Sequence, residues 1–343
     1  MKIRCKTWDK KTAVRSILAI RLQALGDMFG TLPYLQSVRQ QLGQDVTIDF
    51  LTRNEVADIP LAIDLFNHVH VLRGQRNEKR QIFWLLMLLP TLFRKRYDVV
   101  LDLQNNKVSR LARMLTRAKC WTEFDKFSPV YGGERYRQTI NSSGIASIHM
   151  YQKLNLINKK LGLEKLTTSG WKNSDTLIVV NPGGAFSTRH WPVENYVALC
   201  HQLKERCPSA KFLMLGLSRI YETTAYLKKA LADDCIDLTG RTTQSEALSI
   251  LQYVELLVSE DSGLMHMAYF SGVPTVGILG STRSDWTNPK FQHTFFFTSD
   301  DLPCGNCMQS VCPLGTIECL RRLKPEEVAK KGINLMNVKN SRI

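Results

Sequence analysis

A short strand-like stretch that runs into small polar residues is the feature that most constrains the fold of this chain. Residues 253–258 are mostly apolar, Asp261, Ser262 and Gly263 follow, and a helical pattern begins at Leu264. The first turn of a helix presents backbone N–H groups at the positive end of the helix dipole, and together these favour an anion such as phosphate. The alternative interpretation is that Asp261 or Ser262 merely caps the helix. The pattern predicts a strand, a turn and a helix, and it leaves both roles of the turn open.

A second turn of the same kind lies earlier in the same half of the chain. Residues 181–184 read Asn-Pro-Gly-Gly and follow a strand-like run at 176–180. Gly183 and Gly184 allow the backbone to approach a ligand closely, and Arg189 supplies a permanent charge that can bind two phosphate oxygens at once. A plain turn followed by a solvated arginine is the alternative. The two turns together predict an anion-binding site more specifically than either turn does alone.

Strand-like and helix-like runs alternate along both halves of the chain, which is typical of parallel α/β sheets. The expected strands are 16–20, 46–51, 68–72 and 97–103 in the first half, and 176–180, 211–215, 235–238, 253–258 and 274–279 in the second. A chain of 343 residues is long enough for two domains. We therefore expect an α/β protein with two doubly wound, Rossmann-like domains that face each other across a cleft, over residues 1–169 and 170–343. The last helix, expected at 325–336, could pack back on the first domain.

The positive charge of the chain is concentrated in its first half. Residues 1–170 carry 28 lysines and arginines against 14 aspartates and glutamates, whereas residues 171–343 carry 18 against 17. Such a surface indicates a polyanionic partner or an anionic membrane face. The sequence lacks Cys2His2 zinc-finger spacing, an RRM signature and a basic region with heptads, so we expect no nucleic-acid partner. The basic, polar start of the chain and the lack of a run of about 20 apolar residues predict a cytoplasmic protein.

A carboxylate follows the first expected strand. Asp27 stands after Gly26, where a helical pattern begins. In doubly wound sheets ligands bind beyond the carboxyl ends of the strands, so this loop is expected to border the cleft opposite the two anion-binding turns. The alternative is that Asp27 only complements the dipole at the start of the helix.

In their order along the chain, these motifs resemble glycosyltransferase family 9, the bacterial lipopolysaccharide heptosyltransferase-like family of the GT-B fold. The resemblance is carried by residues 25–33, 97–104, 181–184, 189–192, 259–266 and 277–282 and by a cysteine-bearing tail. It implies an inverting glycosyltransferase that moves a sugar, with ADP-heptose as the first candidate donor, onto a lipopolysaccharide core or a related anionic glycan. It also implies that catalysis requires no metal or other cofactor.

The resemblance assigns roles to individual residues. Asp27 corresponds to the general base that removes the proton of the acceptor hydroxyl, and Arg189 would neutralise the charge that builds on the departing diphosphate. The residues implied in binding the donor and its phosphates are Gly183, Gly184, Asp261, Ser262, Gly263, Leu264 and His266. Within this set, Asp261 either contacts the ribose or fixes the turn, and His266 is either a cleft residue or a packed core histidine. The candidates for holding phosphate or carboxylate groups of the acceptor are Gln104, Lys107 and Arg110.

Two positions depart from the family pattern. Relatives commonly carry lysine where this chain has Arg189, and arginine keeps the charge but changes its geometry. Relatives with heptose chemistry often carry histidine where this chain has Gly30, so the resemblance supports a sugar donor without identifying the sugar. Two other functions stay open, a nucleotide-sugar epimerase or hydrolase on the same fold, and a catalytically inactive basic adaptor.

Four cysteines near the end of the chain have a compact spacing. Cys304, Cys307, Cys312 and Cys319 follow the pattern C-x2-C-x4-C-x6-C. Four thiolates suit a structural zinc ion, whereas disulfides are rare in the cytoplasm. A structural zinc site and free thiols are both open interpretations, and an iron–sulfur cluster is a further alternative although the spacing is not that of a ferredoxin.

An apolar run at residues 84–93 is followed by Arg94, Lys95 and Arg96. A helix of this kind could lie in a membrane interface, with its cations at the lipid headgroups. We favour the alternative, a helix that packs on the sheet and has a solvated basic end. Peripheral attachment to the inner face of the inner membrane is accordingly a hypothesis.

Overall fold

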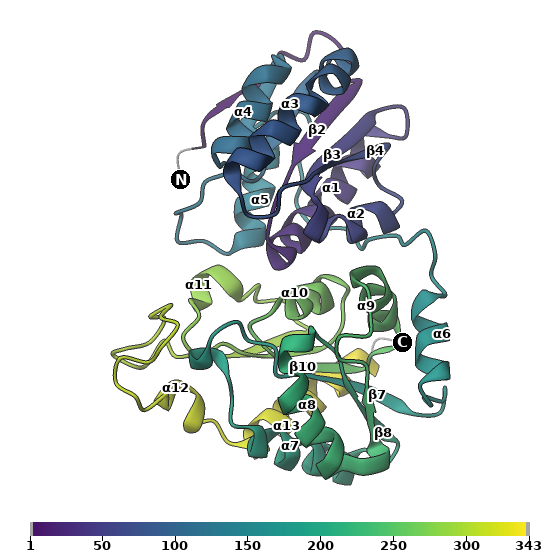
Figure 1. The fold of residues 1–343 in the computed structure, drawn as a ribbon, viewed down its shortest axis with the longest axis vertical. Coiled ribbons are helices and arrows are strands. Elements are labelled where there is room, and N and C mark those ends of the chain that lie inside the picture. The colour runs from purple at the N-terminus through teal and green to yellow at the C-terminus, as the bar shows by residue number, and fades with distance from the viewer. Residues whose placement is uncertain (1–2, 341–343) are drawn as a thin grey trace. The chain divides into compact units, whose positions relative to one another are not determined.

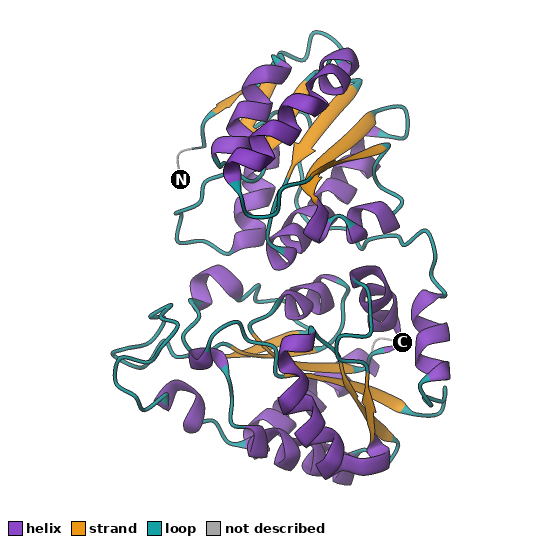
Figure 2. Cartoon of the chain, viewed as in Figure 1, coloured by secondary structure: helices purple, strands orange, loops and turns teal. Residues whose placement is uncertain are grey.

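The computed structural model describes residues 3–340, which divide into two compact units that join between Ile157 and Asn158. Each unit has one sheet with helices on both of its faces (Figures 1 and 2). Helix α6 (Leu161–Thr168) packs against α9 (Gln244–Ile250), and the Gly162 amide donates to the Ser249 hydroxyl at 2.7 Å. Because these contacts attach α6 to the second unit, the division lies before this helix and not near residues 169 and 170.

The first unit contains a six-stranded sheet in the order β1-β6-β5-β2-β3-β4. Its strands are β1 (Cys5–Lys6), β2 (Ser16–Ile20), β3 (Thr47–Arg53), β4 (His68–Leu72), β5 (Val99–Asp102) and β6 (Cys120–Glu123). Its helices are α1 (Leu25–Leu42), α2 (Asp58–Ala62), α3 (Glu78–Lys95), α4 (Lys107–Thr116) and α5 (Gly132–Asn141). All pairings are parallel except that of β1 with β6. Helices cover both faces, so β2 is a continuous apolar run that is fully buried from Ile17 to Ile20.

The second unit contains a parallel six-stranded sheet in the order β12-β11-β10-β7-β8-β9. Its strands are β7 (Thr176–Asn181), β8 (Ala210–Met214), β9 (Cys235–Asp237), β10 (Leu256–Glu260), β11 (Thr275–Ile278) and β12 (Thr294–Phe297). Its further helices are α7 (Val193–Arg206), α8 (Tyr221–Leu231), α10 (Gly263–Phe270), α11 (Ser284–Thr287), α12 (Glu318–Arg321) and α13 (Pro325–Asn340). The nine predicted strands are confirmed within a few residues, while β1, β6 and β12 were not predicted.

Both sheets reverse their strand order beside their first parallel strand. In the first unit the reversal lies between β2 and β5, and in the second it lies between β7 and β10. Loops on the two sides of such a reversal diverge to opposite faces of the sheet and leave a crevice for a ligand. The topology therefore directs attention to the carboxyl ends of these four strands.

The last helix belongs to the core of the second unit. Helix α13 packs on α7 and on strands β10 and β11, with Val328 and Ala329 buried in the core of the second unit. Its apolar residues therefore complete that core.

Helix α3 has two apolar faces rather than one. Leu85 and Leu92 are buried against the sheet, in a cluster with Leu18 of β2 and Val100 of β5. This confirms the packing interpretation for one face. The opposite face exposes Phe83, Met87 and other apolar side chains to solvent. Across residues 3–340 we find no helix with the length and apolar character needed to cross a bilayer.

Candidate functional site

The carboxylate of Asp27 is held at the carboxyl end of β2 by two side chains. It is the third residue of α1, where its charge complements the helix dipole. Arg21 places Nη2 at 2.6 Å from Oδ2, and the Tyr136 hydroxyl donates to Oδ1 at 3.0 Å. The Asp27 side chain is nevertheless 53% exposed. The carboxylate is thus oriented by its neighbours and still open to a ligand.

Arg21 and Tyr136 are themselves fixed by burial. Arg21 donates from Nη1 to the Leu103 carbonyl at 2.6 Å, and its guanidinium lies 5.2 Å from the centroid of the Tyr136 ring. Tyr136 stacks on Phe124 with 4.5 Å between ring centroids. Burial raises the pKa of Tyr136 well above its usual value, against the opposing effect of Arg21, so the phenol remains a neutral donor to Asp27.

Gly30 makes room for this arrangement. A Cβ atom at this position would lie 2.5 Å from the Tyr136 ring, closer than any real contact. The Tyr136 ring therefore occupies the space that a side chain would need at residue 30, one turn after Asp27.

The three acceptor candidates have different surroundings. Gln104 is buried, and its Oε1 accepts from the amides of Leu22 and Gln23 at 3.0 and 3.1 Å, so it fixes the loop that leads to Asp27. Lys107 is 81% exposed and lies 3.6 Å from Glu78. Arg110 is exposed and donates from Nε to Asn105 at 2.6 Å. The two cations stand on the first turns of α4, after the carboxyl end of β5.

A further cation belongs to this region. Lys126 is half-buried, and burial together with the nearby cation of Arg110 lowers the pKa of its ammonium group. The Asp102 carboxylate acts in the opposite direction, and Arg21 again lowers this pKa. Lys126 therefore lies among charges of both signs and adds a cation to the region of Arg110. Lys126 was not among the residues predicted from the sequence.

In the second unit, Asn181 joins the two predicted turns. Its Nδ2 donates to the hydroxyls of Ser259 and Ser262 at 2.9 and 2.7 Å. The Ser262 hydroxyl also accepts from the Met265 amide at 3.2 Å and so caps α10. The capping interpretation therefore holds for the Ser262 side chain. Gly263 and Leu264 form the first turn of the helix, where backbone N–H groups lack intrahelical acceptors.

Asp261 does not cap the helix but holds Arg189. Its Oδ2 lies 2.7 Å from Nη1 of Arg189 and accepts from the Thr282 hydroxyl at 2.8 Å. Burial alone would raise the pKa of Asp261, but contacts with His266, Arg189 and Thr282 outweigh it and keep the pKa below its usual value. Asp261 is thus an anion that holds Arg189, the cation predicted from the sequence to bind phosphate.

Arg189 is nearly buried at the end of a short 3-10 turn, Ser187–Arg189. Its guanidinium carbon lies 4.8 Å from the centroid of the Phe186 ring, a cation–π contact. Its Nε is buried and, among the described residues, has no hydrogen-bond partner. Buried guanidinium groups need acceptors, so Arg189 retains capacity to bind an anionic oxygen.

Glu260, which the sequence analysis left without a role, organises the loop between β7 and α7. It is buried at the end of β10, and its carboxylate accepts from the Gly184 amide, the Trp191 amide and the Tyr196 hydroxyl at 2.8, 2.8 and 3.0 Å. Burial raises the pKa of Glu260 to about 7, although the three hydrogen bonds oppose the shift. The Glu260 carboxylate therefore holds the loop that carries Arg189 on both sides of that residue, at Gly184 and at Trp191.

The two glycines of this loop are enclosed. A Cβ at Gly184 would lie 2.8 Å from both Arg189 Cβ and Glu260 Oε2, and a Cβ at Gly183 would lie 2.3 Å from Asn181 Oδ1. Arg219 donates to the Gly183 carbonyl at 2.5 Å. The glycines thus serve close packing within the loop, in addition to any approach of a ligand.

His266 is partly exposed, so it is neither a fully open cleft residue nor a fully packed core histidine. Its Nε2 lies 3.7 Å from Asp261 Oδ1, its Nδ1 bonds to the Tyr269 hydroxyl, and 20% of its side chain is exposed. It therefore supports Asp261 from the second turn of α10.

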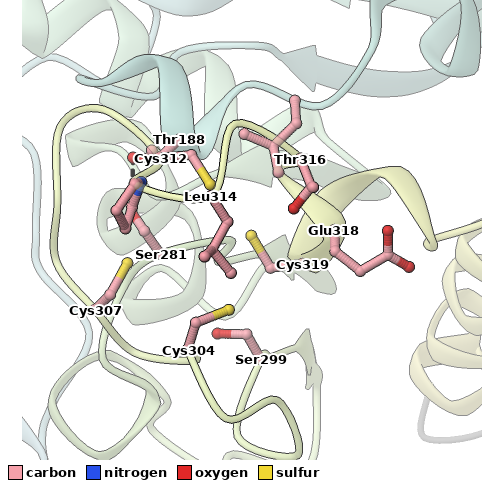
Figure 3. A pocket seen from close by; sticks show the side chains of 12 residues that line it. Thr188, Ser281, Ser299, Cys304, Cys307, Cys312, Leu314, Thr316, Glu318 and Cys319 are labelled. Carbon is pink, nitrogen blue, oxygen red and sulfur yellow. Dashed lines mark hydrogen bonds between the residues drawn. The ribbon is translucent and has the colours of Figure 1, made fainter.

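The four tail cysteines line one pocket. The thiols of Cys304, Cys307, Cys312 and Cys319 lie on different sides of it, around the Leu314 side chain (Figure 3). Their chemistry suits zinc. In residues 3–340, however, no three His, Cys, Asp or Glu side chains are gathered closely enough to hold a metal ion. Four cysteine ligands therefore suit zinc chemically, but in this structure the thiols lie too far apart to bind one ion.

Comparison with known proteins gives a consistent result. The family model described as glycosyltransferase family 9 (heptosyltransferase) matches residues 86–318. Lipooligosaccharide heptosyltransferase 2 of Campylobacter jejuni is 28% identical over 177 residues, which cover 50% of this chain and 54% of that protein. Lipopolysaccharide heptosyltransferase 1 of Pseudomonas aeruginosa is 22% identical over 91% of this chain and 96% of its own length. The chain spans about half the length of the Campylobacter jejuni relatives that it matches.

Solved structures show the same fold. The family 9 glycosyltransferase of Veillonella parvula has a TM-score of 0.81 at 18% identity, over 94% of this chain and 97% of that one. The ADP-heptose lipopolysaccharide heptosyltransferase II of Escherichia coli has a TM-score of 0.75 at 19% identity, over 95% and 99%. These values, with two Rossmann-like sheets, confirm the predicted GT-B fold.

Proposed function

Because the chain belongs to glycosyltransferase family 9, we propose that it is an inverting glycosyltransferase that uses a nucleotide-diphosphate sugar. The observation that carries the proposal is the arrangement in the second unit, where Asp261 fixes Arg189 beside the start of α10. ADP-heptose is the proposed donor and a lipopolysaccharide core the proposed acceptor, because the relatives are named for these compounds.

The second unit would hold the diphosphate of the donor. The amides of Gly263 and Leu264 would bind phosphate oxygens at the positive end of α10, and Arg189 would bind them through its guanidinium. Negative charge builds on the diphosphate as its bond to the sugar breaks, and a cation already in place stabilises that charge. Asp261 orients Arg189 and is not itself in contact with phosphate in this scheme.

The first unit would supply the base. The acceptor hydroxyl gives its proton to the Asp27 carboxylate, its oxygen attacks the anomeric carbon, and the bond between that carbon and the diphosphate breaks, with its electrons passing to the diphosphate. Attack from the side opposite the leaving group inverts the anomeric centre. The half-exposed Asp27 carboxylate, oriented by Arg21 and Tyr136, suits this role.

The same unit would bind the charged groups of the acceptor. Arg110 is near enough to lower the pKa of the half-buried Lys126, and Lys107 is exposed on the first turn of α4. Phosphates or carboxylates on the glycan would relieve the repulsion between these cations.

The proposal is tested with Asp27→Asn and Arg189→Gln, with Asp45→Asn as a control at an exposed acid of the same unit. We expect Asp27→Asn to lower kcat by about 10²- to 10⁴-fold while the donor Kd is unchanged. Arg189→Gln should instead raise the donor Kd. Thermal shifts with ADP-, GDP- and UDP-sugars identify the donor. Normal turnover by Asp27→Asn, or no shift with any of the three sugars, would contradict the proposal.

We also propose that the four tail cysteines are the residues that would hold a structural zinc ion, which requires their thiols to lie closer together than they do in this structure. The ion would clip the segment that joins β12 to α12 and would take no part in transfer. Elemental analysis of purified protein should give about one zinc per chain, lost in Cys304→Ser/Cys307→Ser and kept in Cys5→Ser. Absence of metal from the unaltered protein would mean that the four thiols are free.

A further inference from the structure

The exposed face of α3 is mostly apolar between its charged ends. Phe83, Leu86, Met87 and Phe93 are 56, 46, 58 and 44% exposed, and Pro90 is exposed between them. Their spacing of three, four and seven residues places them on one side of a helix. We call this set the α3 stripe. Sequence analysis did not distinguish it from the buried side of the same helix, because α3 is apolar on both.

The α3 stripe is bordered by cations. Residues 73–96 contain seven lysines and arginines and one acid, Glu78. Arg73, Arg76, Lys79, Arg80, Arg94 and Arg96 are exposed. Lys79 lies one turn before Phe83, and Arg94 lies one turn after Pro90, so charge stands at both ends of the stripe. Glu78 is paired with Lys107 of α4 at 3.6 Å, which leaves the surroundings of the stripe cationic.

We propose that the α3 stripe docks on the surface of an anionic phospholipid bilayer. Apolar side chains on such a helix enter the boundary between headgroups and acyl chains, while lysines and arginines meet the lipid phosphates. Charge complementarity argues for lipid over a second copy of the chain, because a symmetric contact would place two such cationic borders against each other. The docking does not depend on the proposed transfer reaction.

The experiment measures co-sedimentation of the full chain with vesicles of phosphatidylcholine alone, or of phosphatidylcholine with phosphatidylglycerol. The unaltered protein should bind the mixed vesicles and bind phosphatidylcholine weakly, with binding to the mixed vesicles falling as salt rises. Phe83→Gln/Met87→Gln should lower the partition coefficient at least about tenfold. Lys79→Gln/Arg94→Gln should lower it roughly thirtyfold, since each cation near the surface adds about fivefold.

Matched controls lie on α8 of the second unit. Tyr221→Gln/Tyr226→Gln removes two exposed aromatic side chains, and Lys228→Gln/Lys229→Gln removes two exposed cations. Both should bind vesicles like the unaltered protein. If Phe83→Gln/Met87→Gln lowers the melting temperature, Leu86→Gln/Phe93→Gln repeats the test at other positions of the stripe.

Three results would overturn the proposal. The first is no binding of the unaltered protein to mixed vesicles. The second is equal binding by the α3 variants and the unaltered protein, which would assign the membrane contact to another surface. The third is a dimer in analytical ultracentrifugation that Phe83→Gln/Met87→Gln dissociates, which would assign the stripe to self-association.

Discussion

Substitution of Glu260 by glutamine should change how the stability of the second unit depends on pH. The folded chain raises the pKa of this carboxyl from 4.5 to about 7, chiefly by burial. Because the pKa is higher in the folded state, folding favours the protonated carboxyl. This contribution to the free energy of unfolding is fully present below the unfolded-state pKa and is lost as the pH rises through the folded-state pKa.

The size of the effect follows from these two pKa values. Between about pH 5.5 and about pH 8.5, linkage predicts a loss of about 2 kcal/mol in the free energy of unfolding from this one group. Glu260→Gln keeps the size of the side chain but has no titratable proton, so its profile should lack this loss. In the variant, the side-chain NH2 group also faces a loop N–H, and two donors cannot bond to each other. The free energy of unfolding should therefore be lower by about 1–3 kcal/mol at every pH.

Urea unfolding, followed by circular dichroism and tryptophan fluorescence at several pH values, measures the difference. Glu205→Gln on α7, where the side chain is exposed, is the matched control and should follow the unaltered protein. Parallel profiles for Glu260→Gln and the unaltered protein would refute the reasoning. They would mean that Glu260 is as well solvated in the folded chain as in the unfolded one.

Two glycine substitutions test the packing at each site. Gly30→Ala places a Cβ 2.5 Å from the Tyr136 ring, so the ring must move away from Asp27. We expect the free energy of unfolding in urea to fall by about 1–3 kcal/mol and kcat to fall as well. Unchanged turnover would contradict the proposed role of Tyr136. Gly184→Ala places a Cβ 2.8 Å from Arg189 Cβ and from Glu260 Oε2, so the loop must shift. We expect the free energy of unfolding to fall by about 1–3 kcal/mol and the donor Kd, measured by calorimetry, to rise at least about tenfold. An unaltered Kd would count against the loop as part of the donor site.

Much of the fold could be predicted because its signals are local. Buried strands such as β2 and β7 are apolar runs, and the turns after them contain glycine or small polar residues. The missed strand β6 reads Cys-Trp-Thr-Glu, and its buried acid, Glu123, pairs with Arg113 of α4 and with Arg4. A polar residue whose partner comes from another element gives no strand signal in the sequence.

The candidate sites also contain contacts between distant residues, which leave no local signal in the sequence. Asp27, Arg189 and Asp261 were identified from their turns, and these turns are local. Tyr136 is 109 residues from Asp27 and reaches it only through the packing of α5 on α1, so no local pattern indicates it. Glu260 did carry a signal, a charged residue at the end of an apolar strand, and a buried charge there demands partners.

The reversal of strand order in each sheet has an evolutionary consequence. Under the proposed function, each unit shapes its own ligand site from loops at one crevice, and the two units share no residue. If the sites are as proposed, selection for a different glycan would act on the loops after β2 and β5, while a nucleotide specificity set by the loops after β7 and β10 would be inherited unchanged. Lineages that diversify their cell-surface sugars would need to rewrite only half of such a gene, and exchange of one half between relatives would give hybrid enzymes with recombined preferences.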